Sequence, residues 1–163
     1  MHSARLATAV VGMVLASCLV IITPASAAEE YDITNCGAST ITMLSSSPEV
    51  TMLAIDSKGV AFSNHPKKAF DNVSFHSVSL IRIVAGQRAG TTFARYIDTD
   101  GDIVVGETTY APTEATWRFL EGSGKWKGIT GGGKVLPLTN AKPILPGTAQ
   151  ACVRATGTYE IRK

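Results

Sequence analysis

Short runs of β-branched and aromatic residues, each interrupted after a few positions, constrain the fold of this chain more than any other feature. Thr, Val, Ile, Phe, Tyr and Trp cluster in these runs, and Gly, Pro, Asn and Asp separate them. Beyond the first 27 residues, no window keeps the apolar spacing of an amphipathic helix. The pattern therefore predicts an all-β domain, either a barrel or a sandwich of roughly eight to ten short strands.

The expected strands follow from the positions of these runs. They cover residues 31–44, 51–56, 60–63, 72–84, 91–98, 103–110, 115–120, 125–130, 134–139 and 148–162. The first strand is expected to break near residue 37, and a turn at residues 57–59 is expected to join the second and third strands. Three glycines separate the strands at 125–130 and 134–139. Residues 72–84 carry apolar side chains at Val73, Phe75, Val78 and Leu80. The segment Asp98-Thr99-Asp100-Gly101-Asp102 is typical of an Asp-Gly hairpin turn, and the Pro-rich residues 142–147 are expected to form a longer loop.

The first 27 residues have the three-part layout of a secretory signal peptide. Arg5 lies in a short basic region, residues 6–22 are apolar, Pro24 ends the run, and Ala25-Ser26-Ala27 provides small residues for a peptidase. We expect cleavage between Ala27 and Ala28, with the mature protein secreted or periplasmic. A retained membrane anchor is the alternative, although the apolar run lies at the lower limit for a spanning helix.

A second alternative concerns Cys18. Leu15-Ala16-Ser17-Cys18 resembles a bacterial lipobox, in which the cysteine becomes a lipidated first residue. The chain stays apolar after Cys18, where a lipoprotein usually becomes polar. We therefore keep a lipid-anchored envelope protein as the less favoured interpretation.

Without the leader, residues 28–163 form a chain long enough for one domain with its own core. Arg5 is the only charged side chain among the first 27 residues, so the mature chain carries one more basic than acidic residue. Such a balance argues against nucleic-acid binding by bulk electrostatics. No later segment is apolar enough for a spanning helix.

Cys36 and Cys152 are the two cysteines of the mature chain, and they lie near its two ends. In an oxidising compartment they are expected to form a disulfide, which would make the first and last strands neighbours. Two free buried thiols are the alternative. Their spacing does not fit a metal site, and we expect neither a metal nor a cofactor.

Several segments resemble catalytic or binding motifs without completing them. Asp98–Asp102 lacks the positions of an EF-hand loop. Gly128–Lys134 approaches a phosphate-binding loop, but Val135 follows the lysine and no helix can start there. His65 and His76 have no partners in sequence that would complete a Ser-His-Asp arrangement. We therefore predict no catalytic residue.

The stretch Trp117-Arg-Phe-Leu-Glu-Gly-Ser-Gly-Lys-Trp-Lys-Gly-Ile-Thr-Gly-Gly-Gly133 resembles one found in small secreted bacterial proteins of the allene oxide cyclase barrel-like group, which also resemble plant dirigent proteins. Asp98–Asp102 and Gly157-Thr158-Tyr159 extend the resemblance. It implies a closed eight-stranded antiparallel barrel with a central cavity, often as a homo-oligomer. It transfers no reaction, because a shared barrel is a scaffold for many functions.

The sequence therefore predicts an exported β-barrel, not a conventional enzyme, that binds a small apolar or amphipathic ligand in its interior. The alternatives are a cyclase-type or dirigent-type enzyme that steers a reactive substrate, and a structural envelope protein. If a pocket exists, Tyr96, Glu107 and Tyr110 are the residues we expect to line it, from their strand positions.

Overall fold

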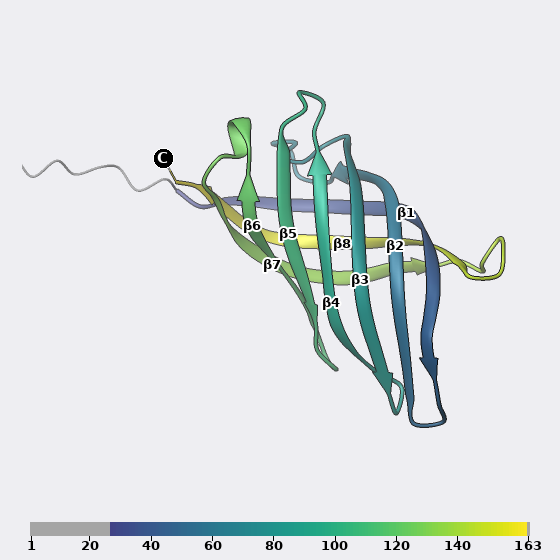
Figure 1. Ribbon diagram of the computed structural model, residues 1–163. Coiled ribbons are helices and arrows are strands. Elements are labelled where there is room, and N and C mark those ends of the chain that lie inside the picture. Colours follow the sequence, from purple (N-terminus) through teal and green to yellow (C-terminus); the bar gives the residue numbers. More distant parts are fainter. Residues whose placement is uncertain (1–26, 163) are drawn as a thin grey trace, which may run out of the picture.

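Eight antiparallel strands form a closed barrel in the computed structural model, which describes residues 27–162 except for the side chain of Asn140 (Figure 1). The predicted leader up to Ser26, including Cys18, lies outside the described residues. The strands are β1 (Glu29–Ser46), β2 (Val50–Ser63), β3 (Val73–Val84), β4 (Gln87–Ile97), β5 (Ile103–Tyr110), β6 (Ala115–Gly122), β7 (Ile129–Asn140) and β8 (Thr148–Ile161). The predicted all-β barrel is confirmed, and the sandwich is not formed.

The barrel follows the chain order, with each strand paired to the next and β8 paired to β1. The closing ladder runs from Glu29 opposite Tyr159 to Thr40 opposite Thr148. Within it Cys36 lies directly opposite Cys152, and the two form a disulfide across 116 residues of sequence. The predicted disulfide is confirmed, and it covalently joins the first and last strands.

The expected turn at Ser57–Gly59 does not form, and β1 and β2 are both continuous. Gly59 lies opposite Gly37 in the ladder between these strands. A Cβ on Gly59 would lie 2.1 Å from the carbonyl oxygen of Cys36. Here glycine permits close approach of two strands and does not turn the chain. A single sequence does not distinguish these two roles of glycine.

The expected strand at residues 125–130 is also wrong. A 3₁₀ turn, η1 (Gly124–Trp126), replaces its first half, and β7 runs straight through Gly131–Gly133. Gly124 has a φ of +52°, and the backbone N–H of Lys125 donates to the carboxylate of Asp102, so the chain turns here. The side chain of Trp126 in this turn is buried.

One end of the barrel is closed by an aromatic plug, which we define as Tyr31, Phe70, Phe119, Trp126 and Tyr159. Phe70 comes from the loop between β2 and β3 and stacks on Trp126, with ring centroids 4.5 Å apart. It also packs against the other three rings at centroid distances of 5.4 to 5.8 Å. Such aromatic contacts bury a large apolar area and exclude water from this end.

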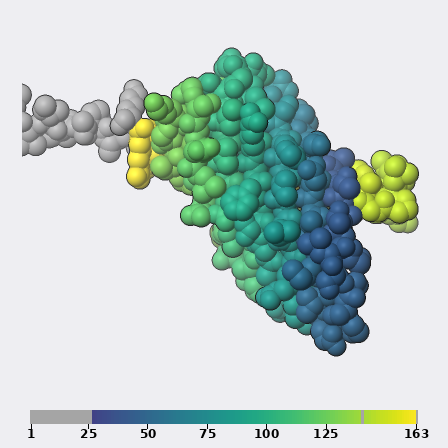
Figure 2. Space-filling model, in the orientation of Figure 1, coloured from purple at the N-terminus to yellow at the C-terminus, as the bar shows by residue number. Residues whose placement is uncertain are grey.

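The opposite end carries the β1–β2, β3–β4, β5–β6 and β7–β8 connections. The β7–β8 loop, residues 141–147, projects as a separate knob (Figure 2). The backbone N–H of Ile41 donates a 2.7 Å hydrogen bond to the Gly147 carbonyl, which attaches this loop to β1. Within residues 27–162, no helix has the length and apolar character needed to cross a membrane.

Candidate ligand-binding cavity

The interior of the barrel contains a cavity of about 410 Å³, lined by inward-facing residues of all eight strands and by Phe70. It begins above the aromatic plug, where Tyr31 and Phe70 are buried. It reaches the opposite end of the barrel, where Arg88, Pro137 and Thr139 line it and are exposed. Eight-stranded barrels either fill their interior with side chains or hold one small ligand, and this one leaves room for a ligand.

Strand β3 shows how the cavity arises. Its inward residues are Val73, Phe75, Ser77, Ser79 and Ile81, whereas Val78 and Leu80 point outward and are exposed. Side chains of a continuous strand alternate strictly between the two faces. The apolar positions at 73, 75, 78 and 80 therefore cannot share one face, and two serines occupy the interior instead.

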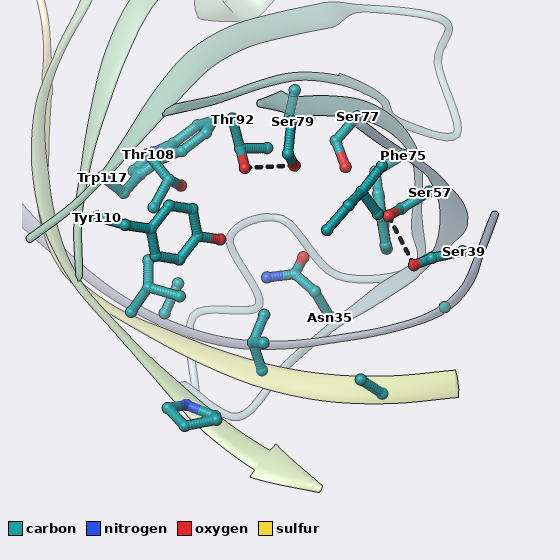
Figure 3. A pocket seen from close by; sticks show the side chains of 18 of the residues that line it. Asn35, Ser39, Ser57, Phe75, Ser77, Ser79, Thr92, Thr108, Tyr110 and Trp117 are labelled. Carbon is teal, nitrogen blue, oxygen red and sulfur yellow. Dashed lines mark hydrogen bonds between the residues drawn. The ribbon is translucent and has the colours of Figure 1, made fainter. Parts of the chain in front are cut away.

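Small hydroxyl side chains form two rows across neighbouring strands, and we call these rows together the hydroxyl wall. The first row, Ser39, Ser57 and Ser77, crosses β1, β2 and β3, and the second, Ser79, Thr92 and Thr108, crosses β3, β4 and β5. All six line the cavity. The oxygens of Ser39 and Ser57 are 2.7 Å apart, and those of Ser79 and Thr92 are 2.6 Å apart (Figure 3).

The strands on the other side of the cavity present a different surface. From β7 and β8 the cavity is lined by Val135, Pro137, Ala149, Ala151, Val153 and Ala155, which we call the apolar wall. Thr139 is the polar exception on β7, and it lies near the open end. The hydroxyl groups of the cavity are therefore concentrated on β1–β5, whereas β7 and β8 present a largely apolar surface.

Two buried polar atoms in this cavity have no hydrogen-bond partner among the described residues: the Asn35 side-chain oxygen and the Tyr31 hydroxyl. Asn35 is 6% exposed and Tyr31 is 2% exposed. A buried polar group without a partner costs about 1–3 kcal/mol. Figure 3 shows Asn35 reaching into the cavity from β1, with the Tyr110 hydroxyl directed towards it from the other side.

The titratable residues that line the cavity are three tyrosines and one arginine. Burial raises the pKa of Tyr31 well above its usual value. Burial also raises the pKa of Tyr96, and the neighbouring phenols of Tyr31 and Tyr110 raise it further. Tyr31 and Tyr96 are therefore neutral hydrogen-bonding groups at physiological pH.

Arg88 is the one charged residue among the described residues that line the cavity. Its guanidinium carbon lies 5.1 Å from the centroid of the Tyr110 ring, within the range of a cation–π contact. The exposed position at the open end keeps this charge hydrated. Among the described lining residues, the one fixed charge is thus positive and lies at the entrance of the cavity.

The three predicted pocket residues have different positions. Tyr96 and Tyr110 line the cavity. Glu107 is not among the lining residues, and its carboxylate accepts a 2.7 Å hydrogen bond from Nε of Arg118 on the neighbouring strand. Glu107 follows the inward residue Gly106 and precedes Thr108, so strand alternation places it on the outer face.

Sequence reasoning missed the hydroxyl wall and Asn35. The signal available was the alternation of Ser77 and Ser79 in a strand whose first inward residues are Val73 and Phe75.

The other candidate groups lie outside the cavity. The His76 imidazole pairs with Asp56 at 2.8 Å on the surface. Within the described part of the chain, no group of three or more His, Cys, Asp or Glu residues is placed to hold a metal ion.

The fold and the cavity define a class of protein: a closed eight-stranded antiparallel barrel with a solvent-accessible interior. Comparison with protein-family models, with curated proteins and with solved structures found no match. The resemblance of residues 117–133 to the allene oxide cyclase barrel-like group therefore stays a prediction.

Proposed function

We propose that the protein is an exported carrier that binds one small, largely apolar ligand inside its barrel. The observation that carries this proposal is the cavity of about 410 Å³, in which the buried oxygens of Asn35 and Tyr31 have no partner among the described residues. This volume is within the range of cavities that hold small molecules. A ligand with a hydrogen-bonding group would fill the space and offset the cost of the two unpartnered oxygens.

The titratable groups favour binding over acid–base catalysis. A general acid or base works best with a pKa near the working pH. The described residues that line the cavity include no carboxylate, histidine or cysteine side chain, and the pKa values of Tyr31 and Tyr96 are raised away from neutrality. A cyclase-type or dirigent-type reaction, steered by cavity shape alone, is a less supported alternative.

Ligand binding can be tested on the mature protein with N-phenyl-1-naphthylamine, a fluorescent apolar probe. We expect saturable binding at one site per chain, and loss of that binding in Ala151→Phe, which fills the cavity from β8. Ala38→Phe is the matched control, because Ala38 lies on β1 next to β8 but is exposed on the outer face. Ala149→Leu provides a smaller filling substitution if Ala151→Phe unfolds the barrel.

Native mass spectrometry of gently purified protein complements the titration, and a bound small molecule in the wild type should be absent from the filled variant. If the wild type binds neither the probe nor a co-purified molecule, the carrier function is wrong. Equal probe affinity in the wild type, Ala151→Phe and Ala149→Leu would also contradict it, because the probe would then bind the outer surface.

Export is part of the same proposal. The disulfide between Cys36 and Cys152 supports an oxidising compartment, since such bonds persist outside the reducing cytosol. The intact mass of the protein from its native host is expected to correspond to a chain starting at Ala28. A mass corresponding to a lipidated Cys18 would instead indicate an anchored envelope protein.

A further inference from the structure

The two sides of the cavity differ in their content of hydroxyl groups, and this difference favours some largely apolar ligands over others. The hydroxyl wall covers five consecutive strands, β1 to β5, and the apolar wall covers β7 and β8. A ligand between them meets rows of hydroxyl groups, set among aliphatic side chains, along one face. Along the other face it meets methyl and methylene groups, with Thr139 near the open end as the polar exception. A ligand that is apolar all round would leave the hydroxyl wall without hydrogen-bond partners, so this arrangement favours a ligand with one polar face.

The hydroxyl wall keeps hydrogen-bonding capacity even where its members bond to one another. A hydroxyl offers one donor and two acceptor positions, and a pair such as Ser79 and Thr92 uses one donor and one acceptor. One hydrogen and several lone pairs in each pair remain free to contact a ligand. Ser77, Ser79, Thr92 and Thr108 are all buried, so their hydroxyl groups are reached only from within the cavity.

Asn35 gives independent support that this surface contacts a ligand. Its side chain is buried, its oxygen has no partner among the described residues, and it projects into the same cavity (Figure 3). An unpartnered amide oxygen calls for a hydrogen-bond donor, which a ligand hydroxyl provides. Arg88 at the entrance adds a positive charge that can pair with an acidic group at one end of the same ligand.

We propose that the natural ligand is a rigid, facially amphipathic ring compound that carries hydroxyl groups on one face and hydrocarbon on the other. A rigid ring skeleton holds its hydroxyls on one side, so it can match both walls at once. A flexible chain would lose conformational freedom to achieve the same match. This inference rests on the proposed carrier function and adds the ligand class.

Hydroxylated steroid acids are suitable probes, because cholate, deoxycholate and lithocholate carry successively fewer hydroxyls on one face of the same skeleton. Each probe is titrated below its micelle concentration by displacement of N-phenyl-1-naphthylamine. The double variant Ser79→Ala/Thr92→Val removes one hydroxyl pair with little change in shape. We expect it to weaken cholate binding about 5- to 30-fold, the effect of one or two hydrogen bonds, while lithocholate affinity changes less than about 2-fold.

Thr91→Val is the matched control, because Thr91 precedes Thr92 on β4 and faces outward. It should leave the ratio of cholate to lithocholate affinity unchanged. Asn35→Leu provides a second variant in case the double substitution unfolds the barrel, and it should lower the same ratio. An equal ratio in the wild type, the double variant and Asn35→Leu would overturn the ligand class.

The two proposals fail in distinguishable ways. If the naphthylamine probe binds inside the barrel but the steroid acids show no dependence on their hydroxyls, the ligand class is wrong and the carrier function stands. If a linear alkyl carboxylate binds more tightly than cholate, the ligand class is again wrong. If neither the naphthylamine probe nor any steroid acid binds, the carrier function itself fails.

Discussion

The indole N–H of Trp126 donates a 2.9 Å hydrogen bond to the carboxylate of Asp98, and this bond fastens η1 to the end of β4. The same carboxylate pairs with Lys125 Nζ at 2.8 Å and accepts the backbone N–H groups of Asp100 and Asp102. Because Trp126 stacks on Phe70, Asp98 holds the aromatic plug in place. The closed end of the cavity therefore depends on one carboxylate in a turn.

We predict that Asp98→Ala lowers the free energy of unfolding by about 2–3 kcal/mol, because it leaves the buried indole N–H without its partner. Asp100→Ala is the matched control. Asp100 also pairs with Lys125, at 2.6 Å, but its side chain is 68% exposed, so its loss should cost less than about 1 kcal/mol. Urea unfolding followed by tryptophan fluorescence measures both, and equal losses would contradict the role assigned to Asp98.

The stability of the barrel should decrease in acid. Burial alone would raise the pKa of Asp98, but hydrogen bonds from Lys125, Trp126 and two backbone N–H groups outweigh it and lower the pKa. The hydrogen bond from Arg154 is the largest cause that lowers the pKa of Asp32. A carboxyl with a lowered folded-state pKa stabilises the protein above the unfolded value, about 3.9, and loses this contribution as the pH falls through the folded value.

We therefore expect the urea midpoint to fall between about pH 4 and pH 2. The double variant Asp32→Asn/Asp98→Asn should show a flatter dependence over the same range, with lower stability at pH 7. Glu114→Gln, at the exposed turn between β5 and β6, serves as the control and should follow the wild type. A double variant with the wild-type slope would show that other carboxyl groups control acid unfolding.

The disulfide should account for much of the stability of the closed barrel. Cross-linking residues 116 apart limits the unfolded chain, and loss of such a bond typically costs 2–5 kcal/mol. Cys36→Ser/Cys152→Ser is expected to unfold at lower urea concentration but to keep its β-rich circular dichroism, because the β1–β8 ladder extends well beyond the disulfide on both sides. Equal stability of the oxidised protein and the double variant would contradict this prediction.

Much of the architecture was accessible from the sequence, because turns and cysteines carry local signals. Residues 103–110 form the predicted strand, and the Asp-Gly turn before it forms with Gly101 at a φ of +85°. The sequence predicts breaks at Gly59 and Gly131–Gly133 that do not form, since glycine in a turn and glycine at a close strand contact look alike in one sequence. Only the residue paired with the glycine on the neighbouring strand distinguishes the two uses.

The cavity was less accessible for a related reason. Apolar residues are expected to point inward, yet in β3 Ser77 and Ser79 face the interior and Val78 and Leu80 face outward. At these positions the hydroxyl-lined interior reverses the usual pattern, so hydrophobicity alone assigns the wrong face. Tyr96 and Tyr110 line the cavity, whereas the apolar-inward assumption gives no reason to expect Asn35 there.

Asn35 offers a prediction that separates a binding role from a structural one. We expect Asn35→Leu to raise the free energy of unfolding of the ligand-free protein by about 0.5–2 kcal/mol, because it removes a buried oxygen without a partner and adds apolar contacts. The same variant should bind cholate more weakly than the wild type does. A residue kept for stability would show a loss of stability on substitution.

The measurement compares urea unfolding without ligand and cholate displacement titrations for the wild type, Asn35→Leu and the control Ile33→Leu. Ile33 is the neighbouring inward residue on β1, is 7% exposed and lines the same cavity. Its replacement by an apolar isomer should change stability by less than about 1.5 kcal/mol and leave the preference for hydroxylated probes unchanged. If Asn35→Leu is destabilised and binds cholate normally, Asn35 is a structural residue whose partner is water.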